Sequence, residues 1–88
     1  MDDFVLLGQL EELAHVLGIQ LRYEKMEEER TFYGGGLCRV RGEHLLIVNS
    51  KATKKDKIQT LVKAVKRFDL DNIYLRPAII EYLEIAQE

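Results

Sequence analysis

One cysteine and two histidines are the side chains best suited to chemistry in this 88-residue chain. Cys38 closely follows three glycines at 34–36, and such a segment can present a reactive thiol. A cysteine nucleophile also needs a base and a site for the oxyanion, and the sequence identifies neither. Phosphate-binding glycine loops lead into a helix, whereas these glycines lead into a stretch typical of a strand. We therefore predict that Cys38 is a core residue and that the glycines bend the chain.

His15 and His44 are the other candidates for metal binding or general-base catalysis. Zinc sites use three or four converging Cys, His or carboxylate ligands, and this chain has a single Cys and no pair of His at a ligand spacing. We expect ordinary structural or surface roles for both histidines. The sequence thus predicts no catalytic residue, no metal and no cofactor.

Charge is distributed unevenly along the chain. The net charge is −2, yet residues 51–67 hold seven bases and one acid. Basic helices bind nucleic-acid backbones by displacing counterions, although a dedicated nucleic-acid domain is usually basic overall. The residues for such binding share the solvent side of a predicted helix: Lys55, Lys63, Lys66 and Arg67. We retain a weak nucleic-acid-binding module that uses residues 53–67 as an alternative function.

A β-hairpin is the element that must position most of these groups. Gly42-Glu43 suits the two central positions of a type II′ turn, because Gly adopts a positive φ at no steric cost. That turn pairs Val40 with Leu45 and Cys38 with Ile47, and these four apolar residues share one sheet face. We predict that this face is the core.

The opposite hairpin face mixes apolar and charged residues. It carries Leu37, Arg39, Arg41, His44, Leu46 and Val48. If the helices cover the other face, these apolar groups form an exposed patch of the kind that marks interfaces. We therefore expect a protein partner or a second copy of the chain to bind there, which makes a homo-oligomer the expected state.

Three amphipathic helices and one further strand complete the predicted fold. Leucines recur at helical spacing over 2–17, and residues 19–25 alternate in the manner of a half-buried strand. Thr53 opens the second helix, with Asp56 three residues later in a variant of the capping box. Pro77 stands early in the last helix, whose inward stripe is Ile79, Ile80, Leu83 and Ala86. The sequence predicts one α+β domain over 1–88: a small two-layer sandwich in the order helix, strand, strand, strand, helix, helix, with an antiparallel three-stranded sheet covered by helices on one face.

The order of elements from Ala14 onward, with LLIVNS at 45–50, resembles the N-terminal part of zincin-like metallopeptidases of the phage-repressor-cleaving type. In that family the helix after this strand carries H-E-x-x-H, whose histidines bind zinc. Here Lys63, Ala64, Val65, Lys66 and Arg67 take its place. The resemblance implies a helix–sheet arrangement without peptidase activity.

Taken together, the sequence favours a small non-catalytic domain that acts through protein contact or self-association. A small hydrolase-like enzyme with an unrecognised site is the remaining alternative. A single cysteine and a start without a basic segment favour the cytoplasm. No apolar run reaches the ~18 residues that a membrane span requires, so we expect no membrane partner.

Overall fold

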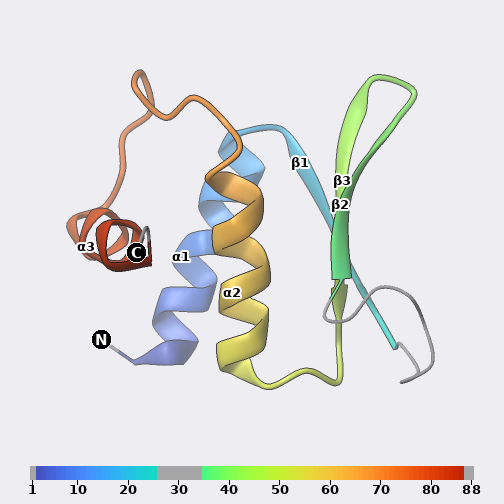
Figure 1. Ribbon diagram of the computed structural model, residues 1–88, viewed down its shortest axis with the longest axis horizontal. Coiled ribbons are helices and arrows are strands. Elements are labelled where there is room, and N and C mark those ends of the chain that lie inside the picture. Colours follow the sequence, from blue (N-terminus) through green and yellow to red (C-terminus); the bar gives the residue numbers. More distant parts are fainter. Residues whose placement is uncertain (1, 26–34, 87–88) are drawn as a thin grey trace.

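The computed structural model describes residues 2–25 and 35–86, and their order of helices and strands is the predicted one. Figure 1 shows the sheet on one side of the molecule and the helices on the other. The elements are α1 (Asp3–Val16), β1 (Ile19–Glu24), β2 (Gly35–Val40), β3 (Glu43–Asn49), α2 (Lys54–Val65) and α3 (Pro77–Ala86).

The sheet is mixed, in the strand order β1-β3-β2. β2 and β3 pair antiparallel as predicted, but β1 lies beside β3 and runs parallel to it, with Leu21 opposite Leu46. The expectation of a fully antiparallel sheet was therefore wrong for β1. The alternation of apolar and polar residues in β1 predicts one buried and one solvent-exposed face. It does not predict which strand β1 pairs with, or in which direction.

The hairpin turns at Arg41-Gly42, and not at Gly42-Glu43. Val40 pairs with Glu43 and Leu37 with Leu46. Both turn residues have positive φ, 53° for Arg41 and 82° for Gly42. Two positive φ values define a type I′ turn, whose twist matches that of the flanking strands. The register differs by two residues from the prediction, so the residues that share a face are unchanged.

The predicted burial of the two hairpin faces was inverted. Leu46 and Val48 are buried at 1% and 0% exposure, whereas Val40 is 50% exposed and Cys38 is exposed. The helices cover the face with mixed composition because its charged residues gather near the turn. On that face Arg39 and His44 form the pair nearest the turn, while the apolar residues lie under α2.

Local signals explain where α1 and α2 begin. The Asp2 carboxylate accepts a hydrogen bond from the backbone N–H of Phe4 at 3.0 Å, and the Thr53 hydroxyl accepts one from Asp56 N–H at 3.1 Å. Each cap satisfies a donor that has no partner within its helix. Gly18, at a φ of 82°, reverses the chain between α1 and β1.

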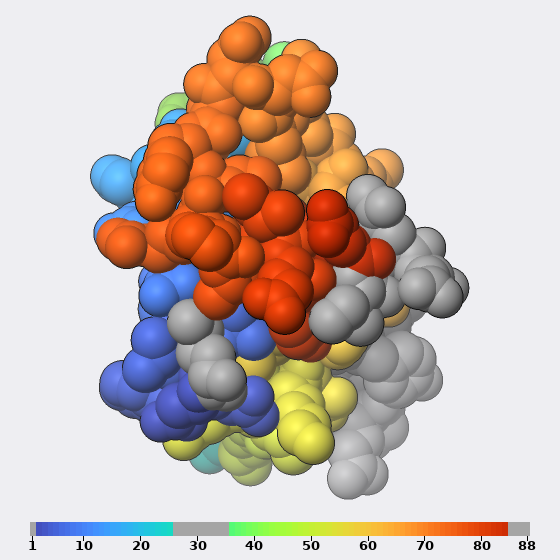
Figure 2. All heavy atoms as spheres, turned by 90° about the vertical axis from the view of Figure 1, so that its left-hand side faces the viewer, coloured from blue at the N-terminus to red at the C-terminus, as the bar shows by residue number. Residues whose placement is uncertain are grey.

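The core lies between the sheet and the α1–α2 pair and continues to α3. Its buried apolar residues are Leu6, Leu10, Leu13, Ala14, Ile19, Leu46, Val48, Ile58, Leu61, Val62, Ala64, Val65, Ile79 and Leu83. α3 lies on the side of α1 and α2 away from the sheet, so the arrangement has a third layer that the two-layer prediction lacked. Figure 2 shows α3 and the segment before it spread across the helix pair. Within 2–25 and 35–86, no helix has the length and apolar character needed to cross a membrane.

Candidate functional site

The six residues predicted to bind a partner are divided between two environments. Leu46 and Val48 are buried, and Leu37 packs against the same core. Because the chain's own helices cover these residues, they are not a free docking surface. Arg39 and Arg41 are exposed at the hairpin tip. His44 packs edge-on against Phe68, just after α2, at 4.7 Å between ring centroids.

The opposite side of the sheet carries a second apolar surface, on which Cys38 and Val40 are exposed and Leu45 and Ile47 are half-buried. We call Cys38, Val40, Leu45 and Ile47 the outer sheet face. Leu45 pairs with Cys38 on one side and Gln20 on the other. Ile47 lies between Gly36 and Arg22, so no side chain on β2 shields it. None of the described helices lies on this side of the sheet (Figure 1).

Polar groups along β1 border the outer sheet face, and they satisfy one another. Arg22 and Glu24 form an ion pair at 2.9 Å. The Gln20 amide donates a hydrogen bond to Glu43 at 3.3 Å. Surface pairs of this kind contribute little to stability. Their importance here is that the apolar strip has neutralised edges.

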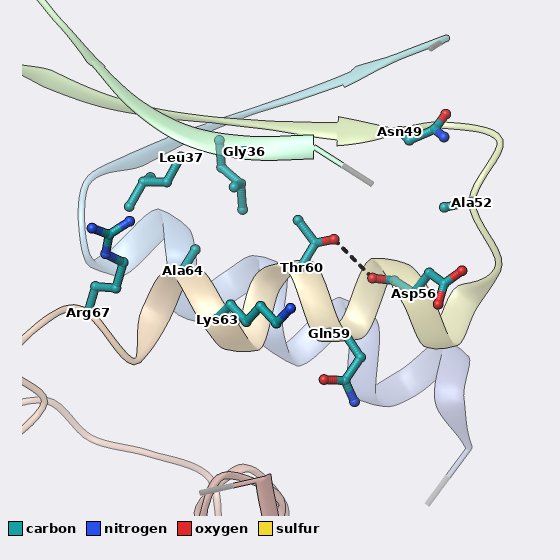
Figure 3. A pocket seen from close by; sticks show the side chains of 11 residues that line it. Gly36, Leu37, Asn49, Ala52, Asp56, Gln59, Thr60, Lys63, Ala64 and Arg67 are labelled. Carbon is teal, nitrogen blue, oxygen red and sulfur yellow. Dashed lines mark hydrogen bonds between the residues drawn. The ribbon is translucent and has the colours of Figure 1, made fainter. Parts of the chain in front are cut away.

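A second candidate site is a groove of about 500 Å³ between α2 and the β2–β3 hairpin, shown in Figure 3. Its floor is apolar, with Leu37, Leu46 and Ala64. Its α2 wall is polar and its far end is closed by the segment after β3. The lining residues are Gly36, Leu37, Leu46, Asn49, Ala52, Asp56, Gln59, Thr60, Lys63, Ala64 and Arg67.

The charges in the groove are separated along α2. Asp56 lies at the first turn and Arg67 just past the helix end, about 16 Å apart at 1.5 Å per residue. Arg67 extends up toward Leu37, and Lys63 runs along the helix (Figure 3). The ion pairs of the described residues are Arg22–Glu24 and Arg76–Glu12, so neither groove cation is paired among them.

Two of the four bases predicted to bind nucleic acid line the groove. These are Lys63 and Arg67, whereas Lys55 and Lys66 lie outside its lining. Two other bases of α2 interact with aromatic rings, Lys54 with Phe4 at 5.4 Å and Lys57 with Tyr23 at 5.8 Å. The basic segment is therefore distributed over several sides of α2.

Sequence reasoning identified the groove cations but missed the site they belong to. Asp56, Thr60, Lys63 and Arg67 follow a spacing of four, three and four residues, which places them on one side of a helix. That spacing could have identified the α2 wall of the groove from sequence. The opposite wall could not be predicted, because it depends on which face of the hairpin packs against α2.

His15 is separate from the other two groups and lines a hollow with Glu43. Cys38 and His44 both line a different hollow, together with Arg67 and Asp69. Cys38 and His44 are on neighbouring strands but point to opposite sheet faces. Among the residues that the structure describes, no group of three His, Cys, Asp or Glu side chains could hold a metal ion.

Comparisons of this chain with protein-family models, with curated proteins and with solved structures found no match. The resemblance to zincin-like metallopeptidases therefore stays a prediction from the order of elements.

Proposed function

We propose that this chain is a small non-catalytic domain that acts by self-association, and that its contact surface is the outer sheet face. One observation carries the proposal: four apolar side chains share a sheet face that none of the described helices covers. Burying such groups against a second copy removes apolar area from water, at about 25 cal/mol per Å².

A second copy suits this surface because its edges are electrically balanced. The Arg22–Glu24 ion pair and the Gln20–Glu43 hydrogen bond are made within one chain. A twofold contact places the same patch on both sides, so a surface with an uncompensated charge at its centre would repel itself. Here the centre consists of Leu45 and Ile47. Two such faces can stack about 10 Å apart, as in β-sandwiches.

The area of the outer sheet face sets the expected affinity of the dimer. Three strands of six or seven residues present a face of roughly 20 by 14 Å. That footprint is well below the ~800 Å² per partner of a standard interface. We therefore expect a weak, concentration-dependent dimer with a Kd of about 10⁻⁴ M.

The test compares two Val→Lys variants by sedimentation across a concentration series. Val40→Lys puts a charge on the outer sheet face, and Glu43 opposite it offers a favourable cross-strand pair that preserves the hairpin. Val16→Lys is the matched control. Val16 is 58% exposed against 50% for Val40, and it lies in the last turn of α1, where the helix dipole favours a cation.

We expect wild type and Val16→Lys to dimerise equally and Val40→Lys to remain monomeric. The rate of Cys38 alkylation gives an independent readout, because a covered thiol reacts more slowly as the protein concentration rises. A wild type that stays monomeric at millimolar concentration, or a Val40→Lys variant that associates like wild type, would refute the proposal.

A further inference from the structure

We propose that the groove beside α2 binds a small phosphomonoester, with Lys63 and Arg67 holding the phosphate. This inference is independent of the outer sheet face, which lies on the other side of the sheet. Lys63 lies in the last turn of α2 and Arg67 two residues past its end, so two like charges stand four residues apart. Two cations at that spacing repel each other.

The helix dipole accounts for cations near the end of α2, but not for their placement on a groove. Residues at a helix end can carry a positive charge on any side. Both residues line the groove: Arg67 reaches up toward the hairpin, and Lys63 runs along α2 with its amine directed away from Arg67 (Figure 3). Neither has an acidic partner among the described residues. An anion entering the groove would therefore meet two cations that form no ion pair with a described carboxylate.

The two side chains complement each other chemically. Arginine offers a planar fork of donors, and lysine is a compact point charge on a flexible stem. A phosphate dianion has three terminal oxygens, so it can accept a bidentate contact from Arg67 and a further bond from Lys63. A single carboxylate has only two oxygens and is satisfied by one arginine fork. This difference favours a phosphate over a carboxylate.

The rest of the groove indicates that the phosphate belongs to a larger molecule. The floor provides apolar contact through Leu37, Leu46 and Ala64. Asn49 and Thr60 place polar atoms further along, away from Arg67 (Figure 3). A volume of about 500 Å³ lies within the range of small-molecule sites. The arrangement thus fits a compact organic body with its phosphate at the Arg67 end.

The test uses adenosine monophosphate as the probe, followed by amide chemical shifts and by calorimetry. Adenosine, inorganic phosphate, succinate and a single-stranded oligonucleotide are the comparison ligands. The variant is Lys63→Gln with Arg67→Gln. The control is Lys25→Gln with Lys55→Gln, which removes the same net charge from residues outside the groove lining.

We expect adenosine monophosphate to shift amides at the hairpin and along α2, and to bind the groove variant at least about tenfold more weakly, the loss expected for one charged hydrogen bond. The control variant should bind like wild type, and adenosine should bind more weakly than its monophosphate. No binding by wild type, equal loss in the control, or succinate binding as well as phosphate would each overturn the proposal. Tighter oligonucleotide binding with a steep salt dependence would also overturn it, in favour of a nucleic-acid surface.

Discussion

Tyr23 makes the most unusual side-chain contact in the chain. Its hydroxyl donates a hydrogen bond to the Glu11 carboxylate, which joins β1 to α1. Burial, and then the hydrogen bond and negative charge of Glu11, raise the pKa of the Tyr23 phenol well above its usual value near 10. The folded state therefore holds this proton more tightly than the unfolded chain does.

Because of this contact, we expect the unfolding free energy to depend on pH in the alkaline range. Below pH 10 the phenol is protonated in both states and the contact stabilises the fold; as the pH rises above 10, the unfolded chain loses the proton first and that stabilisation declines. Tyr23→Phe should lower the unfolding free energy by about 1 kcal/mol at pH 8, and by less at pH 11. Urea unfolding at both pH values measures the difference. Tyr74→Phe is the control, because Tyr74 is 80% exposed. A Tyr23→Phe penalty that does not shrink with pH would contradict this account.

Among the elements, the hairpin turn leads to the sharpest prediction, because its backbone conformation is unusual. Arg41 occupies a left-handed conformation that is unfavourable for an ordinary side chain, and Asn-Gly is a preferred sequence for type I′ turns. Arg41→Asn should therefore raise the unfolding free energy by roughly 0.5 kcal/mol. With a turn at Gly42-Glu43, position 41 would be extended and Asn would weaken the strand. Urea denaturation of this variant distinguishes the two turns.

Two identical substitutions should have opposite effects on stability. A Cβ added at Gly42 or at Gly8 meets no atom within 4 Å, so the backbone alone decides the outcome. Gly42→Ala places alanine at a φ of 82° and should cost about 1 kcal/mol. Gly8→Ala lies within α1 and should stabilise the chain by about 0.5–1 kcal/mol. The comparison of both midpoints in urea is the test, and a gain in stability for Gly42→Ala would contradict the assigned turn.

Helices and their caps were readable from sequence because their signals are local. Asp2, Thr53 and the leucines of α1 act within a few residues of one another. Pairing across the sheet is not local, and Leu45 to Val48 form an unbroken apolar run in the central strand. Such a run does not reveal which face is covered. The sequence therefore grouped the residues of the outer sheet face correctly but predicted that they form the core. For the same reason it did not identify the hairpin residues that form the second wall of the groove beside α2.

At the scale of the whole molecule, the third layer determines whether the chain folds as one unit. α3 contributes Ile79 and Leu83, at 2% and 6% exposure, to the same core as the sheet and the helix pair. The Arg76 side chain also binds Glu12 of α1 at 3.0 Å just before α3 begins. That pair is exposed and contributes little. The attachment of α3 therefore depends on its buried apolar residues.

Adjacent isoleucines in α3 test this attachment directly. Ile79 is buried and Ile80 is 43% exposed, although the sequence placed both on the inward stripe. Ile79→Ala should lower the unfolding free energy by about 2–4 kcal/mol, and Ile80→Ala by less than about 1 kcal/mol. Urea unfolding followed by circular dichroism should show a single transition in each case, shifted far more by the first substitution. If Ile79→Ala instead left the main transition in place and produced a separate early one, α3 would be an appendage that unfolds independently of the sheet and the α1–α2 pair.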